Sequence, residues 1–196
     1  MKKFLTFLTF LTIILTSVGK VHSIEADIFV QSTVNRASEA LNDKFSKEEK
    51  IEKLKEVASE TVDIKGIGFY TLGAHRKNIS SDEISQYEML FEQYFLKSFS
   101  SRLAEYSNPE IKVVSKKKLN ENYTMVTSIL VGTEQRPEVK IDWRIYTKNP
   151  ENPLIRDLII EGLSLARTQK EEFSSIIQSN DGDINALFST LKEFIK

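Results

Sequence analysis

Apolar side chains recur every three or four residues along two segments that each begin with a helix-capping sequence. Ser46 stands three residues before Glu49, and Ser80 stands three residues before Glu83. In this spacing the hydroxyl and the carboxylate each accept a hydrogen bond from a backbone N–H group that the first helical turn leaves free. Apolar residues at helical spacing follow each capping sequence. After Ser80 many of them are aromatic, and this pattern stops before residues 108–109. Two helices are therefore predicted to begin at these serines.

Four further segments have the apolar spacing of helices. One precedes Ser46, one lies between the two capped helices, and two lie at the end of the chain. Their positions are Val30, Val34, Ala37 and Leu41; the segment 64–74, with Gly66 and Gly68; Leu165, Phe173, Ile176 and Ile177; and Ile184, Leu187, Phe188, Leu191 and Ile195. The two glycines weaken the segment 64–74 as a helix and make it a candidate soft point of the fold.

The apolar period changes from helical to two after residue 109. Along residues 139–146 every second side chain is apolar and the others are polar or tyrosine, as a strand with one buried face requires. Residues 111–115, 123–131 and 154–161 are also rich in strand-forming side chains. Because the connections are too short for a crossover, these strands predict a four-stranded antiparallel meander. Helices, then strands, then helices indicate an α+β domain with helices packed over one face of the sheet.

The first 23 residues have the pattern of a secretory signal peptide. Lys2 and Lys3 precede an apolar run over residues 4–18, and compact side chains follow near Ser23. The run is shorter than the roughly 20 residues that cross a bilayer. The prediction is cleavage near Ser23, export to the periplasm, and one domain over residues 24–196. Because the chain contains no cysteine, this domain depends on its apolar core and not on disulfides.

The exported part is acidic. Residues 1–23 contain three of the 27 basic residues and none of the 28 acidic ones, so 24 against 28 leaves a net charge of about −4. This net negative charge argues against nucleic acid as a partner, and the lysines are scattered among glutamates. The run Lys116-Lys117-Lys118 is the one basic cluster that stands out, and a solvated turn is its simplest interpretation.

The inventory of reactive side chains is small. His75 is the one histidine after residue 23, and no zinc-protease, calcium-loop, phosphate-loop or nucleophile-elbow motif occurs. Metal and nucleotide sites are therefore not expected. Asp142, Asp157 and Glu161 leave open a general acid or base in an isomerase-like or hydrolytic enzyme. Ion pairs with neighbouring arginines are the simpler account of these carboxylates.

Large apolar side chains on the predicted helices and strands face one shared interior. Periodicity cannot distinguish a filled core from a hollow one, because both need the same apolar lining. On pattern alone a filled core is the simpler interpretation.

Several sequence stretches resemble the MlaC (toluene-tolerance) family of phospholipid carriers. They are residues 139–144 (VKIDWR), 157–165 (DLIIEGLSL) and 168–173 (TQKEEF), together with the Leu72-Gly73 pair and the helix that carries Tyr87 and Phe91. The likeness covers nearly the whole chain after residue 23. Three positions depart from the family pattern, with Arg76 in place of an aromatic residue, Pro153 in place of tryptophan and Arg156 in place of tyrosine.

The resemblance implies a nuclear-transport-factor-like fold in which helices and a curved sheet enclose an apolar pocket for lipid tails. It also implies a non-enzymatic carrier with phospholipid as cargo and no cofactor. Its partners would be an outer-membrane lipoprotein–porin complex and the periplasmic ring of an inner-membrane ABC lipid transporter. On this interpretation the interior is hollow.

Ten side chains are candidate contacts for the lipid tails, because they lie on apolar sides of helices and strands that are predicted to face each other and because of the family likeness. They are Phe69, Leu72, Phe91, Phe95, Met125, Ile141, Trp143, Ile145, Leu158 and Ile160.

Overall fold

The structure is a computed structural model that describes residues 23–134 and 136–196. The predicted signal peptide lies outside the described residues, apart from Ser23. The helices are α1 (Ala26–Ala40), α2 (Lys47–Thr61), α3 (Ile64–Leu72), the 3-10 helix η1 (His75–Lys77), α4 (Ser81–Leu103), α5 (Leu165–Gln178) and α6 (Ile184–Ile195). The strands are β1 (Ile111–Lys118), β2 (Tyr123–Leu130), β3 (Val139–Tyr146), β4 (Leu154–Ile160) and β5 (Leu163–Ser164).

Both predicted capping boxes form and start the helices that they were expected to start. The hydroxyl of Ser46 accepts a hydrogen bond from the N–H of Glu49, whose carboxylate accepts one from the N–H of Ser46. Ser80 and Glu83 repeat this arrangement at the start of α4. Local sequence alone therefore sets the beginnings of α2 and α4.

The sheet has one strand more than the four predicted. Its five strands follow chain order, and neighbouring strands pair antiparallel. The additional strand is β5, in which Leu163 and Ser164 pair back onto the end of β4. The two residues between the strands, Glu161 and Gly162, have φ values of 48° and 86°, and positive φ at both positions is the geometry of a tight hairpin turn. The strand predicted over residues 154–161 ends at Ile160, and Glu161 belongs to the turn.

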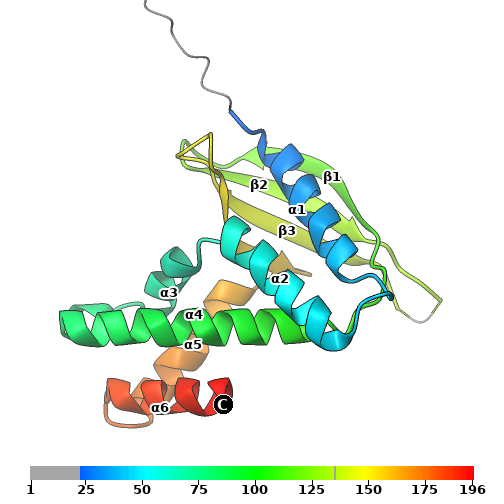
Figure 1. Ribbon diagram of the computed structural model, residues 1–196. Coiled ribbons are helices and arrows are strands. Elements are labelled where there is room, and N and C mark those ends of the chain that lie inside the picture. The colour runs from blue at the N-terminus through cyan, green and yellow to red at the C-terminus, as the bar shows by residue number, and fades with distance from the viewer. Residues whose placement is uncertain (1–22, 135) are drawn as a thin grey trace, which may run out of the picture.

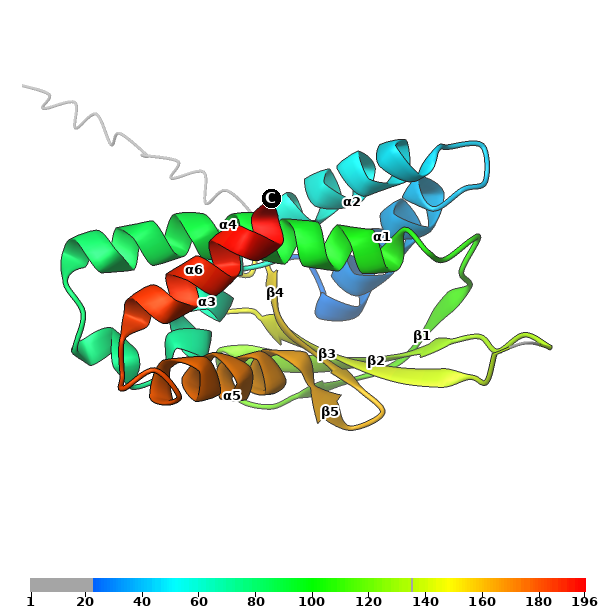
Figure 2. The same ribbon diagram turned by 90° about the horizontal axis from the view of Figure 1, so that it is seen from below.

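Helices α1, α2 and α4 lie on one side of the sheet, whereas α5 lies level with it beside β4, and the arrangement gives an α+β fold (Figures 1 and 2). Helix α1 packs against β1 and β2, while α3 and α5 pack against β4. The long helix α4 has its main contacts with α2, α3 and α6. In Figure 1, α1 and α2 lie across the strands, whereas α4 lies beyond the β4 side of the sheet. Helix α4 is therefore held mainly by other helices.

The basic run at residues 116–118 was predicted as a turn, but it forms the end of β1. The ammonium group of Lys116 lies 2.6 Å from the carboxylate of Glu25 and 2.8 Å from that of Asp27. The hydrogen bond from Lys116 holds the pKa of the Asp27 carboxyl below its ordinary range. These ion pairs join the start of α1 to the edge strand, a long-range contact that local sequence does not reveal.

Asp157 ties the sheet to α5. Its side chain is buried, although carboxylates are rarely buried without partners. It accepts hydrogen bonds from the Ser164 hydroxyl at 2.6 Å and from the Ala166 N–H at 3.0 Å, and a guanidinium nitrogen of Arg144 lies 3.7 Å away. Since Ala166 is in the first turn of α5, the negative charge also lies at the favourable end of the helix dipole. Asp157 thus fixes where α5 leaves the sheet.

We expect the substitution Asp157→Ala to lower the free energy of unfolding by about 2–4 kcal/mol, because it leaves a buried hydroxyl and a helix N–H without an acceptor. Urea denaturation followed by circular dichroism measures this change. The control is Glu121→Ala, which removes an exposed carboxylate and should change stability by less than about 0.5 kcal/mol. Equal stabilities of the two variants would contradict the role of Asp157.

Candidate functional site

Strand pairing places five of the ten candidate side chains on the face of the sheet that the helices cover, which we call the inner face. Residues directly opposite each other in an antiparallel pair share a face. The pairs are Ile141 with Ser128 and Ile160, Trp143 with Val126 and Leu158, and Ile145 with Thr124 and Ile155. The predicted alternation along β3 is therefore confirmed.

Met125 does not join this group. It pairs with Arg144, between two residues of β3 that point to the inner face, so its own side chain points to the outer face. The prediction that Met125 shares an interior with Trp143 is wrong, and Met125 is left out of the candidate site.

The helices bring further candidate side chains toward the inner face. Leu72 of α3 and Phe91 of α4 belong to one continuous apolar cluster with Trp143 and Ile145, and Phe95 packs against that cluster. The ring centroid of Phe91 lies 5.6 Å from that of Tyr87. The rings of Phe95, Phe173 and Tyr94 also lie near Phe91, at 6.1, 6.2 and 6.4 Å. Helices α3, α4 and α5 and the sheet thus share one apolar interior.

Phe69 and Ile160 lie outside the cluster that joins the other candidates. Phe69 is half-buried, and the ammonium group of Lys65 lies 5.8 Å from the centroid of its ring. Ile160 is on the inner face but at the last position of β4, next to the turn into β5. Both therefore lie at the margin of the candidate site.

Burial divides the remaining candidates into two groups. Leu72, Phe91, Trp143 and Ile145 are at most 8% exposed and form ordinary core. Phe95, Ile141 and Leu158 are only partly buried, although they pack against the same cluster. Phe99, one turn beyond Phe95, is also partly buried, and the two rings stack with centroids 5.6 Å apart. Apolar surface therefore stays accessible on both the sheet and α4.

The polar groups of this interior are neutral and paired. The indole N–H of Trp143 donates to the buried hydroxyl of Ser128 at 2.7 Å. The hydroxyls of Thr71 and Tyr87 lie 2.8 Å apart, and burial raises the pKa of the Tyr87 phenol, which keeps it protonated. Within residues 23–134 and 136–196 no buried side-chain nitrogen or oxygen lacks a partner. An apolar ligand would therefore not cover a polar group that lacks a hydrogen-bond partner, which would cost free energy.

The three carboxylates considered for catalysis do not face this interior. Asp142 and Asp157 pair with outer-face positions of the neighbouring strands. Asp142 accepts a hydrogen bond from Thr127 at 2.5 Å and lies 3.0 Å from the ammonium group of Lys140. Glu161 is exposed in the β4–β5 turn. The simpler interpretation, in which these groups serve ion pairs and helix capping, matches the contacts observed.

The glycines of α3, predicted as soft points, stand where neighbouring side chains leave little room for a Cβ atom. A Cβ atom on Gly68 would lie 2.9 Å from the ring of Phe91, and one on Gly66 would lie 2.7 Å from the guanidinium group of Arg156. Arg156 pairs with Asp63, which also caps the start of α3. The arginine that departs from the family pattern thus anchors α3 to β4.

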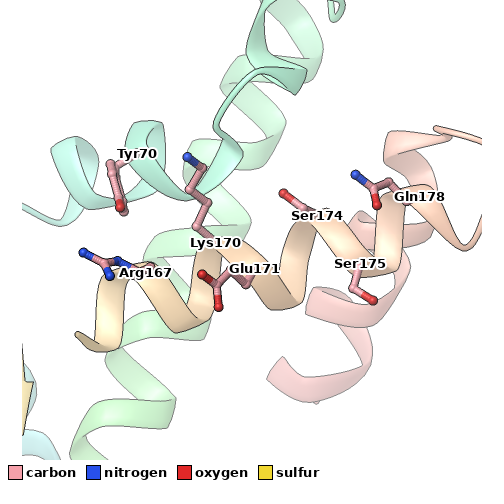
Figure 3. Close-up of a pocket in the computed structure, with 7 residues that line it drawn as sticks. All are labelled: Tyr70, Arg167, Lys170, Glu171, Ser174, Ser175 and Gln178. Carbon is pink, nitrogen blue, oxygen red and sulfur yellow. The ribbon is translucent and has the colours of Figure 1, made fainter. Parts of the chain in front are cut away.

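Two hollows in the surface were not anticipated from the sequence. One lies between α3 and α5 and has a volume of about 410 Å³. Its walls are Tyr70, Arg167, Lys170, Glu171, Ser174, Ser175 and Gln178, of which Figure 3 shows Tyr70 on α3 and the others on α5. The other, of about 500 Å³, lies at the α1–α2 turn and is lined by Arg36, Glu39, Ala40, Asn42, Lys44, Phe45, Lys53, Glu56 and Val57. The polar spacing along residues 167–178 signals an exposed helix face, but only the fold shows that α3 borders it.

Neither a metal-binding cluster nor a membrane-spanning helix is found in the described part of the chain. No cluster of three or more histidine, aspartate or glutamate side chains has the geometry to hold a metal ion in that part. Nor does any of its helices combine the length and the hydropathy that crossing a membrane requires.

The fold and the site define an α+β protein in which helices cover one apolar face of an antiparallel sheet. The profile of the MlaC protein family matches residues 31–193, and the chain belongs to this family. A similar solved structure is that of the phospholipid-binding protein from Ralstonia solanacearum in complex with a phospholipid. It matches with a TM-score of 0.72 and 19% identity over 88% of this chain and 97% of that one. No curated protein matches the chain.

Acid should remove the stabilisation that comes from Asp142. Burial alone would raise the pKa of its carboxyl, but the hydrogen bonds from Thr127 and Lys140 outweigh burial and hold the pKa below its ordinary range. A lowered pKa in the folded state means that the charged form stabilises the fold above about pH 4, and that this contribution is lost as the pH falls through the folded-state value.

We therefore expect Asp142→Asn to lower the free energy of unfolding at neutral pH, and we expect the difference from the unmodified chain to shrink below about pH 4. Urea denaturation of both proteins at several pH values measures it. A difference that stays constant across this range would contradict the assignment.

Proposed function

We propose that this protein binds a phospholipid and holds its acyl chains between the inner face of the sheet and the helices. The observation that carries the proposal is the partly exposed apolar surface on both layers, with Ile141 and Leu158 on the sheet and Phe95 and Phe99 on α4. Family membership and the phospholipid complex of the Ralstonia solanacearum protein support it. Phe69 and Ile160 would contact the lipid at the margin.

The energetics of lipid transfer explain why such a carrier needs an apolar interior. Each methylene group exposed to water costs about 0.8 kcal/mol, so a lipid with some thirty of them faces a cost on the order of 20 kcal/mol. An interior whose polar groups are neutral and paired can offset most of this cost. The polar headgroup should remain in water, because burying it would cost the free energy of its hydration.

We propose further that the chain is exported to the periplasm and shuttles phospholipid between the two membranes. The signal-peptide pattern of residues 1–23 and the family support this localisation. The partners would be an outer-membrane lipoprotein–porin complex and the periplasmic ring of an inner-membrane ABC transporter. A catalytic function has less support, because Asp142 and Asp157 point away from the apolar interior.

Protein purified without added lipid should release close to one phospholipid per chain into organic solvent. We expect Ile141→Trp to lower this amount several-fold, because the larger side chain occupies space on the inner face. Mass spectrometry with phosphorus analysis measures the lipid, and circular dichroism confirms folding.

The matched control is Met125→Trp, which introduces the same ring on the outer face of the neighbouring strand. It should leave the bound lipid unchanged. A wild-type protein without extractable phospholipid would refute the carrier proposal, and equal losses in both variants would refute the assignment of the inner face.

Trp143 supplies a direct test of where the acyl chains lie. It is the single tryptophan of the chain, so the intrinsic emission comes from one position. A phospholipid with brominated acyl chains should quench this emission strongly, whereas the same lipid without bromine should not. If a bound brominated lipid leaves the emission unchanged, the acyl chains lie elsewhere.

A further inference from the structure

The groove between α3 and α5 collects groups that bind anions. Figure 3 shows Arg167 and Lys170 on the side of α5 that faces Tyr70, whose hydroxyl is directed toward α5. The hydroxyl of Ser174 lies on the same side of the helix. The hollow of about 410 Å³ falls in the size range of small-molecule sites, roughly 300–1,000 Å³. It is thus large enough for an anion together with part of the molecule that carries it.

Both cations of the groove lack an acidic partner among the residues that the structure describes. Elsewhere in the fold, cations such as Lys116 and Arg156 form ion pairs with carboxylates. Lys170 instead has its ammonium group 5.2 Å from the centroid of the Tyr70 ring, and no ion pair is formed by Arg167 within the described part. Two like charges three residues apart on a helix repel each other. An anion between them would remove this repulsion.

The backbone beside the groove holds Lys170 in place. Gly73, which ends α3, has a φ of 56°, and a Cβ atom there would lie 2.8 Å from Cε of Lys170. The lysine stem therefore runs directly against the backbone at a position that favours glycine. Arg76 in the adjoining 3-10 helix donates to the carbonyl oxygen of Phe69 at 3.4 Å. The contacts of Lys170 with Gly73 and of Arg76 with Phe69 hold two positive side chains next to the C-terminal end of α3.

The charge of this corner is opposite to that of the whole domain. Arg167 and Lys170 against Glu171 give the groove one net positive charge, and Arg76, which donates to the carbonyl oxygen of Phe69 next to Tyr70, raises the local total to two. Residues 24–196 carry about −4. Such a local reversal of sign draws anions to one place on an acidic protein.

We propose that the groove between α3 and α5 is a second ligand site, separate from the apolar interior, and that it binds a phosphate ester. A guanidinium group matches phosphate with two parallel hydrogen bonds, and a lysine adds a point charge. The hydroxyl of Tyr70, which is directed toward α5 on the side of Arg167, supplies a further hydrogen-bond donor. The space beyond the anion accommodates the organic part of the ester.

The test measures binding to two sources of phosphate ester. Glycerol 3-phosphate, with inorganic phosphate beside it, is the soluble probe in isothermal titration calorimetry. Vesicles of phosphatidylglycerol, compared with phosphatidylcholine, present the ester on a bilayer in a sedimentation assay. We expect binding to at least one source, and we expect the double variant R167Q/K170Q to weaken it about tenfold or more.

The matched control is K148Q/K192Q, which removes two exposed lysines outside the groove and changes the net charge equally. It should bind within about twofold of the unmodified protein. Tyr70→Phe, which deletes one hydroxyl and keeps the ring, should weaken binding by a smaller factor than the double variant. Preference for the soluble ester or for the vesicles identifies the source of the ligand.

Three outcomes would overturn the proposal: no binding to either source, equal binding by the unmodified protein and R167Q/K170Q, or equal weakening in K148Q/K192Q. The amount of extracted phospholipid per chain should be the same in all these variants. A lack of extracted phospholipid in the unmodified protein would refute the carrier proposal and leave the groove to be judged on its own binding data.

Discussion

A sheet with one apolar face must have that face covered, and this requirement organises the whole protein. The alternation along β3 puts Ile141, Trp143 and Ile145 on one side and charged residues on the other, and pairing with β2 and β4 extends the division across the sheet. Because the strands are antiparallel, the outer face can remain in water. All the covering must then come from the helices on the inner side.

The helices provide this cover unevenly. Helix α1 is fixed to the β1 edge by the ion pairs of Lys116, and α3 and α5 are fixed to β4 by Arg156 and Asp157. Both attachments lie toward the edges of the sheet. Helix α4 lies beyond the β4 side of the sheet in Figure 1 and depends mainly on other helices for its contacts. Its Phe95 stays partly exposed, as does Ile141 on the inner face of β3.

The sequence could predict what depends on neighbouring residues. The capping boxes at Ser46 and Ser80 and the alternation of β3 are local signals, and the structure confirms them. In β2 both alternating sets contain apolar residues, and the inner one includes Ser128, so only pairing with β3 reveals that Met125 points outward. Longer-range contacts, such as those of Lys116 and of the groove beside α5, depend on elements that are distant in the chain.

Placing charge and apolar surface on different faces has a consequence for how the protein can work. In the described part, the carboxylates and cations of the sheet lie at outer-face or edge positions, while the polar groups of the interior are neutral and paired. Salt and pH therefore act mainly on contacts that the outer surface makes, since screening is weak inside an apolar interior. Temperature acts on apolar burial through its large heat capacity. The charged outer surface and the apolar interior thus rest on different forces and on different residues.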